Sequence, residues 1–442
     1  MTSARKLAYP ALLAYGAPIV GIAYLLFFVQ FYFLKFATDV LLLPPAMVGV
    51  VFAVMKLWDA ASNPLVGSWS DRTRSRFGRR RPFLFGALVP LAIGFIMLWS
   101  PPGALGPTGL MLWSSAALFV FFSAFALYTI PHAALGAEMS PDSHERTRLF
   151  GVRQISFTLG ILLAFAGIQM AMTAAVPRET AASMAIPTSL LAAAVLLITP
   201  LVVRERTAVP AGGESLWTGL RDVVANRPAR ILLFVWFVEN LGVGAVGTMA
   251  PYIAEYLLRR PDIVGILPAT YVISGVLTIP IWVRISRSAG TRDTWMIAML
   301  LAAASFGGMM FVGAGDLTLL MLLLVVAGSA MGCGSVLSSS IMADLIDVDE
   351  HRTGERKEGV YSASMNFALR IGNSLATAVS GLVLSMAGFL PNAEQSAESL
   401  LGIRILFAGL PCLGFLVGMA LFRGFPRARM SPAAGPAPVH AG

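Results

Sequence analysis

Lys56, Asp59 and Asn63 form a polar face within an otherwise apolar stretch from Val48 to Trp69. Their spacing of three and four residues places them on one side of a helix. A carboxylate in the middle of a membrane costs roughly 2.5 to 3.5 kcal/mol on insertion scales, so such groups occur mainly where they line a path for ions or solutes. Asp59 is therefore predicted to act in transport. The alternative is an ion-pair partner that only locks two helices together.

Arg153 and Arg370 are candidate partners for Asp59, because both lie in apolar stretches elsewhere in the chain. An arginine keeps its positive charge in proteins. Burial opposes ionisation of a carboxyl group and a nearby cation favours it, so the protonation of Asp59 can depend on which group faces it. We predict that a salt bridge to Asp59 forms and breaks between two halves of the chain. The alternative is that each arginine extends to a membrane boundary.

Other polar residues in apolar stretches are candidates for binding a solute. His132 follows a proline, Glu239 and Asn240 lie in the middle of one stretch, and Asn366 lies one turn before Arg370. Side chains of these types at such depths either line a pathway or hydrogen-bond between helices. For His132 the alternative is a structural histidine whose ring nitrogens are satisfied by neighbours.

Charged residues gather where the second and fourth apolar stretches end. Asp71 and Arg72 begin an arginine-rich loop that runs to Pro82, and Glu138 precedes Arg146. Orientation by positive charge explains the arginines but not their acidic neighbours. We predict a charge network with a gating role that latches one conformation.

The composition excludes an ordinary soluble domain. Hydrophobic residues make up 57% of the chain, charged residues 12%, and the mean hydropathy is +0.76, whereas soluble proteins average about 25% charged residues. Apolar stretches of about 20 residues recur, each long enough to cross a hydrocarbon core of roughly 30 Å. The sequence predicts an all-α integral membrane protein with twelve transmembrane helices. The predicted spans are 11–37, 45–69, 82–100, 109–137, 150–175, 181–203, 229–257, 262–284, 293–312, 317–345, 357–387 and 398–422.

Basic residues lie in alternate loops, which explains the net charge of +9 without a nucleic-acid partner. Of the 32 lysines and arginines, 24 fall on one side of the predicted topology, and such an excess is typical of cytoplasmic loops. Both termini are therefore predicted to be cytoplasmic, and the membrane to be a bacterial inner membrane.

The longest polar interruption, residues 204–228, divides the predicted spans into two six-helix bundles, 1–203 and 229–423. Part of this linker has the apolar spacing of an amphipathic helix that lies on a membrane surface. Residues 424–442 are rich in proline and are predicted to be disordered. The apolar residues of the predicted linker helix are Leu216, Trp217, Leu220, Val223 and Val224.

Several chemistries are excluded. Cys333 and Cys412 lie in predicted spans, so neither a disulfide framework nor a Cys/His metal site is expected. Gly242, Gly244 and Gly247 match a dinucleotide-binding pattern, but they lie in an apolar span with no preceding strand, so we predict helix packing instead. The sequence shows neither a nucleophile–base constellation nor a P-loop. We therefore expect no enzyme, no ATP-driven pump and no organic cofactor.

The combined motifs resemble the glycoside-pentoside-hexuronide:cation symporter (melibiose permease-like) family of the major facilitator superfamily. The resemblance extends over nearly the whole chain. It implies the major facilitator fold and cation-coupled symport of a small organic solute, a sugar or glycoside, by alternating access. The motifs that carry it are Tyr15-Gly16, Thr38-Asp39, Lys56-Leu-Trp-Asp-Ala-Ala-Ser-Asn-Pro64, the loop Arg72 to Pro82, Glu145-Arg146 with Arg153, Ala343-Asp-Leu-Ile-Asp347, Thr353-Gly354 and Glu358-Gly359.

The resemblance also implies roles for single residues. Asp59 would take part in cation binding, Arg153 would contact the substrate, and Arg370 occupies the position of a helix-eleven lysine that interacts with the cation site. With Lys56, these residues form the predicted coupling site. A lone carboxylate binds a proton unaided, whereas sodium needs several oxygen ligands, which Asp59 and Asn63 would help to supply. We favour H+ over Na+ as the coupling ion.

The chain departs from the family pattern at three positions. Asn63 stands where the pattern has a second carboxylate, and Ala23 and Thr129 align with its sugar-binding aspartates. Carboxylates are strong acceptors for hydroxyl groups. Their loss makes a galactoside an unexpected cargo and leaves Thr129 as the candidate at that substrate position.

Two alternatives stay open from the sequence. Related eukaryotic transporters move lysophospholipids, and aromatic residues of the first span would suit such an amphiphile or would simply face lipid. A non-transporting receptor or scaffold is the alternative of another class. The predicted partners are a small-molecule substrate, a coupling cation and the lipid bilayer, and the predicted state is a monomer. The aromatic residues in question are Tyr24, Phe27, Phe28, Phe31 and Tyr32.

Overall fold

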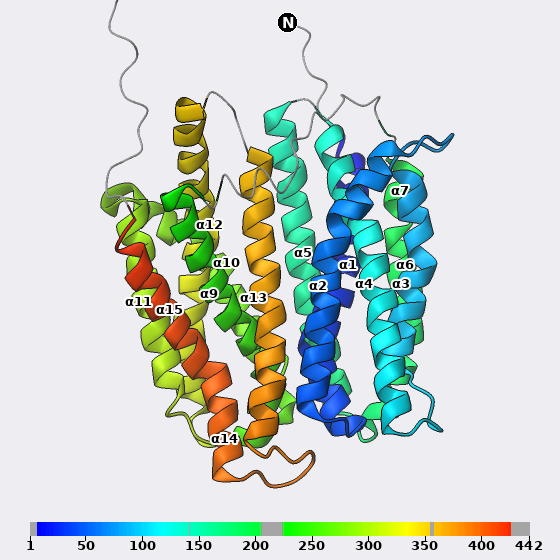
Figure 1. The fold of residues 1–442 in the computed structure, drawn as a ribbon, viewed down its shortest axis with the longest axis vertical. Coiled ribbons are helices and arrows are strands. Elements are labelled where there is room, and N and C mark those ends of the chain that lie inside the picture. Colours follow the sequence, from blue (N-terminus) through cyan, green and yellow to red (C-terminus); the bar gives the residue numbers. More distant parts are fainter. Residues whose placement is uncertain are drawn as a thin grey trace, which may run out of the picture. The chain divides into compact units, whose positions relative to one another are not determined.

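Helices account for nearly all of the chain that the computed structural model describes, which comprises residues 7–140, 142–203, 205, 223, 225–353 and 358–425. This described part contains no β-strand (Figure 1). The elements are α1 (Tyr9–Lys35), the π-helical η1 (Phe36–Val40), α2 (Pro45–Arg72), α3 (Arg81–Trp99), α4 (Pro107–Glu138), α5 (Ser143–Met172), α6 (Pro177–Leu196), α7 (Ile198–Val202), α9 (Arg227–Tyr252), the π-helical η2 (Ile253–Leu257), the 3₁₀-helical η3 (Pro261–Ile263), α10 (Ile266–Ala289), α11 (Thr291–Met309), α12 (Leu317–Thr353), α13 (Glu358–Met386), α14 (Ala397–Arg404), the π-helical η4 (Ile405–Gly409) and α15 (Leu410–Phe422).

Eleven helical segments of the described residues are long and apolar enough to cross a membrane. The remaining long helix, α11, has 19 residues, but its first turn carries Arg292 and Asp293, which lower its mean hydropathy. Each of the twelve predicted spans overlaps one of these helices, and their limits differ by at most eight residues. The spans near η1, η2 and η4 include π-helical turns. The predicted all-α membrane fold is confirmed.

Prolines mark where several of these helices begin. Pro45, Pro82 and Pro107 each lie in the first turn of α2, α3 and α4. Proline lacks the backbone N–H, but the first-turn N–H groups have no partner inside the helix, so proline costs little there. Pro64 lies inside α2, and the helix nevertheless continues past it to Arg72.

The chain forms two compact units. Unit 1 comprises Met1–Pro210, Gly247–Ala269 and Ser374–Ile403, and unit 2 comprises Ala211–Val246, Thr270–Asn373 and Arg404–Gly442. Within unit 1, α1 packs against α5 and α6, and α4 packs against α2 and α3; within unit 2, α11 packs against α12 and α15. Most of the predicted linker helix and nearly all of the predicted tail lie outside the described residues, so the predicted boundaries at 204–228 and 424 stay predictions.

The glycines that match a dinucleotide-binding pattern lie inside α9, at close contacts between helices. A Cβ atom on Gly242 would lie 2.6 Å from Cα of Pro411, and one on Gly247 would lie 2.1 Å from the ring of Phe31. Membrane helices use small residues in this way because lipid gives them no hydrophobic incentive to associate. The predicted packing role of these two glycines is confirmed.

Candidate functional site

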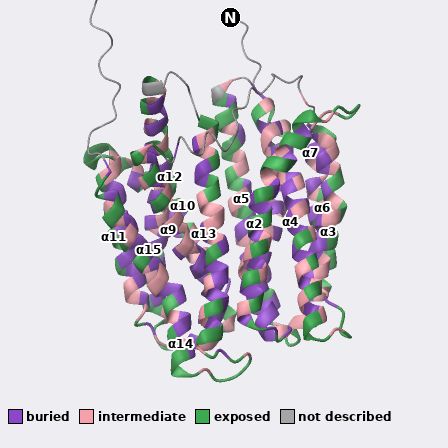
Figure 2. Cartoon of the chain, in the orientation of Figure 1, coloured by how far each residue is buried: buried purple, intermediate pink, exposed green. Residues whose placement is uncertain are grey.

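Asp59 lies on the buried face of α2, with 2% of its surface exposed, and Lys56 is 7% exposed one turn earlier. Asn63, one turn later, is half-buried. They share this face with Phe52 and Val66, and Figure 2 shows how buried and exposed residues alternate along α2. The predicted polar face is therefore a buried one, as a functional carboxyl group in a membrane requires.

The ammonium group of Lys56 is fixed where α1, α2 and α4 meet. Its Nζ donates to Oε1 of Gln30 at 3.0 Å and lies 5.0 Å from the centre of the Phe122 ring. A cation–π contact of this kind contributes about 0.5 to 2 kcal/mol. Lys56 thus holds a positive charge in place one helical turn from the carboxyl group of Asp59.

His132 and Arg153 belong to one polar cluster inside unit 1. The His132 ring is fully buried and stacks on Tyr15 at 4.4 Å and on Tyr128 at 5.6 Å between ring centres. Its Nε2 lies 3.4 Å from Oγ1 of Thr199. Arg153, half-buried on α5, interacts electrostatically with both Tyr15 and His132. The structure brings the two predicted residues together. Nδ1 of His132 is buried without a hydrogen-bond partner among the described residues, so the neighbours do not satisfy both ring nitrogens.

Three of the predicted substrate-binding residues hydrogen-bond to their own helix. Thr129, Asn240 and Asn366 each donate to the backbone carbonyl four residues earlier, at 2.9, 2.7 and 2.9 Å. Asn366 is exposed, whereas Thr129 and Asn240 are half-buried. A bond of this kind is local and is exchanged easily, so it neither supports nor opposes the predicted role.

The aromatic residues of α1 divide into two groups. Phe28 and Tyr32 are buried and pack on Trp99 of α3, with ring centres 4.8 and 5.4 Å away. Tyr24 is half-buried and stacks on Phe28, and its hydroxyl lies 2.4 Å from where a Cβ of Gly167 would be. Phe28 and Tyr32 therefore belong to the core of unit 1 and are not available as a lining for an amphiphile.

The predicted residues of the second half lie in unit 2. Glu239 is 5% exposed on α9, and Arg370 is half-buried on α13. The predicted salt bridge between Asp59 and Arg370 joins residues of different units and stays a prediction.

A charge network occupies the end of unit 1 where α2 and α4 finish. Arg80 is 6% exposed; its guanidinium pairs with Asp71 at 2.5 Å and Glu138 at 3.1 Å and donates to Oγ of Ser70 at 2.7 Å. Arg79 adds a second bond to Glu138 at 2.7 Å. The predicted acidic residues are thus paired within the network.

Arg80 occupies the place in this network that the sequence predicted for Arg72. Arg72 and Arg146 are exposed and form no ion pair within the described residues. Arg72 ends α2 and points to the outside, whereas the loop folds back and brings Arg80 against Asp71. The sequence could not show this reversal, which depends on Gly78.

The loop reverses its direction at Gly78. The φ of this residue is +100°, a backbone conformation that glycine adopts readily and other residues rarely adopt. The carboxylate of Glu205 accepts hydrogen bonds from the backbone N–H groups of Arg79, Arg80 and Arg81 at 2.6, 2.7 and 2.8 Å. A Cβ on Gly78 would lie 2.5 Å from that carboxylate. Glu205 therefore satisfies the otherwise unpaired N–H groups at the start of α3.

We expect Arg80→Ala to weaken the transport rate and the thermal stability far more than Arg72→Ala. Removing Arg80 leaves Asp71 without its cation, Glu138 with Arg79 alone and Ser70 without its donor, and each hydrogen bond to a charged group contributes about 1.5 to 3 kcal/mol. An exposed arginine contributes only about 0 to 1 kcal/mol. Thermal unfolding and solute uptake of both variants measure the difference; equal effects of the two substitutions would show that the network is not a structural or gating element.

A second network lies at the C-terminal end of α1. We name it the Lys35 cluster. The Nζ of Lys35, 3% exposed, bonds to the carboxylate of Asp39 and to Oε2 of Glu255 at 2.9 Å. The aromatic rings of Tyr252 and Tyr256 lie 5.0 and 4.0 Å from Nζ. The members of the cluster are Lys35, Thr38, Asp39, Tyr252, Glu255, Tyr256 and Asn392.

Hydrogen bonds extend the cluster across three distant parts of the chain, all within unit 1. The Tyr256 hydroxyl donates to Asp39, and the Thr38 and Tyr252 hydroxyls lie 2.8 Å apart. The side chain of Asn392 donates to the backbone carbonyl of Asp39 at 2.7 Å. Thr38 Oγ1 also donates to Oδ1 of Asp39 at 2.6 Å. Asp39 therefore receives the Lys35 cation and the hydroxyls of Tyr256 and Thr38, so its buried charge is compensated.

Two of the π-helical turns carry this cluster. η1 contains Thr38 and Asp39, and η2 contains Glu255 and Tyr256. A π-helical turn breaks the regular i to i−4 hydrogen-bond ladder and is often found at functional sites. The first and seventh long helices thus end in the same irregular way, at the point where they contact each other.

Comparison with known proteins decides the family. A family model described as MFS/sugar transport protein matches residues 14–427. The chain belongs to this family. Among its relatives, an uncharacterized symporter of Bacillus subtilis (strain 168) is 25% identical over 94% of this chain and 91% of its own. The isoprimeverose transporter of Lactiplantibacillus pentosus is 25% identical over 88% and 82%.

Among solved structures, that of a D-xylose-proton symporter covers 96% of this chain and 99% of its own, with a TM-score of 0.67 at 16% identity. It confirms the major facilitator fold, which the sequence motifs predicted. The chain is thus an integral membrane transporter and not an enzyme.

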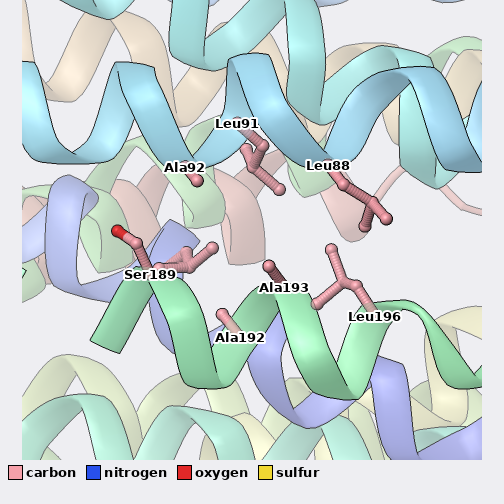
Figure 3. A pocket seen from close by; sticks show the side chains of 8 residues that line it. Leu88, Leu91, Ala92, Ser189, Ala192, Ala193 and Leu196 are labelled. Atoms are coloured by element: carbon pink, nitrogen blue, oxygen red, sulfur yellow. The ribbon is translucent and has the colours of Figure 1, made fainter. Parts of the chain in front are cut away.

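The substrate site of the transporter is not the apolar hollow between α3 and α6. Figure 3 shows Leu88 and Leu91 of α3 facing Ala193 and Leu196 of α6. The hollow is too narrow to admit a solute, and Ser189 is the polar residue of its lining. A sugar needs several hydrogen-bond partners, which an alkyl lining does not offer.

The sequence reasoning missed the Lys35 cluster. Thr38 and Asp39 carried part of the family resemblance, and Lys35 lies within the first predicted span, yet neither was assigned a role. Charged residues four apart at the end of an apolar span were a usable signal, because such a pair can bond across one helical turn. The partners from α9, η2 and the loop at Asn392 lie more than 200 residues away, so the sequence near Lys35 does not indicate them.

Proposed function

We propose that the chain is a cation-coupled sugar symporter that works by alternating access. The sugar-transport family supports the substrate class, and the relatives named as symporters support the coupling. The observation that carries the proposal is the carboxyl group of Asp59, 2% exposed within a membrane-spanning helix and beside the fixed charge of Lys56. A receptor or scaffold has no need of such a group, since it destabilises the helix in lipid.

The coupling step centres on α2. Asp59 takes up the cation from one side of the membrane and releases it to the other, with Lys56 and Asn63 as its neighbours and Arg370 as its partner when the cation has left. A proton is the favoured ion because a single carboxyl group binds it without further ligands. Sodium would require oxygen atoms of Asp59, Asn63 and nearby hydroxyls as ligands. Arg153, with Thr129 and Tyr24, binds the sugar.

The two charge networks lie at opposite membrane surfaces. The arginine-rich end of unit 1 is cytoplasmic, in keeping with the positive-inside pattern. The N-terminus is on the same side, because the backbone N–H of Leu7 donates to Glu145 at the start of α5, at 2.9 Å. The Lys35 cluster is then the extracellular gate, which is closed in this structure. The transporter acts as a monomer in a bacterial inner membrane, with both termini in the cytoplasm.

A ligand-stabilisation screen tests the substrate class. The full chain in detergent is heated with monosaccharides, pentosides, glucuronides or lysophospholipids, each with and without sodium. Stabilisation by a sugar and by no lysophospholipid supports the proposal, because a ligand that binds the folded state alone raises the unfolding temperature. Stabilisation by lysophospholipids alone would replace the sugar with an amphiphile, and a sodium-dependent shift would replace the proton with sodium.

A further inference from the structure

Glu239 points into the interior of unit 2, a place that neither coupling at Asp59 nor the predicted substrate role explains. Its carboxyl group borders two glycines, Gly334 of α12 and Gly418 of α15. A Cβ on Gly334 would lie 3.9 Å from Oε2 of Glu239, and one on Gly418 would lie 3.9 Å from Oε1. Both glycines make room for the carboxyl group at a contact between helices, and a methyl group at either position would touch it.

The carboxyl group has no cationic partner. Oε1 of Glu239 has no hydrogen-bond partner within the described residues, and Glu239 is a member of none of the ion pairs that they form. An ionised carboxylate buried without a partner is so costly that the group is found neutral instead. The geometry therefore favours the protonated, neutral form of Glu239 in this conformation.

The groups that face Glu239 from each neighbouring helix are neutral. α10 contributes Tyr271 and α12 contributes Cys333, both close enough to interact electrostatically with Glu239. α11 contributes Trp295, whose indole N–H borders the same space over Gly334. α15 contributes Gly418, and the Tyr271 hydroxyl has no hydrogen-bond partner among the described residues.

The remaining neighbour of α9 is α13, which carries Arg370 and packs on another side of α9. Gly372 of α13 packs against the backbone at Phe237 and Leu241, and these positions lie on the side of the helix opposite to Glu239. Among the residues that the structure describes, the surroundings of Glu239 thus supply hydroxyl, thiol and indole groups but no positive charge.

We propose that Glu239 is a second proton-binding site of the transporter, inside the C-terminal half and separate from Asp59. The proposal rests on the proposed function. A proton from water on one side neutralises the carboxylate, which allows α9 to pack against α12 and α15. When those helices separate, water or a cation reaches the carboxyl group and the proton leaves to the other side. The net change is the transfer of one proton across the membrane, with no other bond made or broken.

Infrared spectroscopy of the full chain at neutral pH tests the protonation directly. We expect a C=O band of a buried protonated carboxyl group in the wild type that disappears in Glu239→Gln. Glu394→Gln is the matched control, since its side chain is 91% exposed to water, and it should leave the band unchanged. Asp59 can contribute a band of its own, which both proteins would share, so the test is the difference between the two spectra. A C=O spectrum of Glu239→Gln that is identical to that of the wild type overturns the proposal. This measurement needs no sugar, so it stands even if the proposed function fails.

Transport in proteoliposomes tests the coupling. With one proton at Asp59 and a second at Glu239 for each sugar, a gradient of one pH unit supports about hundredfold accumulation. We expect Glu239→Gln to reduce this ratio to about tenfold, while exchange of internal for external sugar continues and shows that the variant is folded. Full proton-driven accumulation in Glu239→Gln would contradict the proposal and leave Glu239 as a neutral packing residue. If the wild type responds to no cation gradient, the proposed function fails instead.

Discussion

Replacing Lys35 by methionine should open the extracellular end of the transporter. The substitution keeps the length of the side chain but leaves the carboxylates of Asp39 and Glu255 near each other without their shared cation. Breaking a buried ion pair by removing one partner costs about 3 to 5 kcal/mol. Every 1.4 kcal/mol changes an equilibrium constant by about a factor of ten. The population of the closed arrangement relative to the open one should therefore fall at least about a hundredfold.

A cysteine placed behind the gate measures this opening. Ala250 of α9 is 3% exposed and lines a small apolar hollow with Phe31, inside unit 1. In a background with Cys333→Ala and Cys412→Ala, Ala250→Cys should react with an impermeant thiol reagent about tenfold faster or more once Lys35→Met is added.

The matched control for Lys35 is Arg259→Met at the same end. Arg259 pairs with Glu394 at 3.4 Å, but both side chains are more than 70% exposed, so this pair contributes about 0 to 1 kcal/mol. Arg259→Met should leave the labelling rate unchanged, and adding Asp39→Asn to Lys35→Met should slow labelling again by removing one of the facing charges. Labelling of Lys35→Met at the wild-type rate would show that the cluster does not hold the gate closed.

Replacing Asp59 by asparagine should abolish cation-driven accumulation of sugar. Asparagine has nearly the same shape but binds no proton at physiological pH, so the coupling step has no carrier. Under a gradient of one pH unit, we expect the accumulation ratio to fall at least about tenfold. Exchange of sugar across the membrane should continue, because it needs only the substrate site and the movement of the two bundles.

Glu394→Gln is also the control for this substitution, since it removes an equivalent but 91% exposed carboxylate. It should accumulate sugar as the wild type does. Lys56→Met should lower accumulation less than Asp59→Asn, because it removes the fixed neighbouring charge and not the carrier. Gradient-driven accumulation that persists in Asp59→Asn would remove Asp59 from the mechanism.

The sequence predicted the spans and the family because both depend on local patterns. Apolar stretches must be about 20 residues long to cross the bilayer, and their limits differ from those of the helices by at most eight residues. The buried face of Lys56, Asp59 and Asn63 followed from helical spacing alone. Predictions of this kind need no knowledge of how helices pack.

Predictions that depended on the direction of side chains were less secure. Glu239 lies mid-span as predicted, but its carboxyl group points between α12 and α15. Arg80 replaces Arg72 in the charge network because Gly78 reverses the loop. The Lys35 cluster joins residues more than 200 positions apart. Periodicity gives the face of a helix, but it does not show which other helix covers that face.

The most direct test of coupled transport is the movement of cations that the sugar itself causes. Proteoliposomes of the wild-type chain, without an imposed gradient, receive the sugar identified by the stabilisation screen while external pH and internal sodium are recorded. The account predicts that sugar entry draws protons inward and raises the external pH, and that Asp59→Asn removes this response. Sugar entry without any movement of protons or sodium would contradict the account.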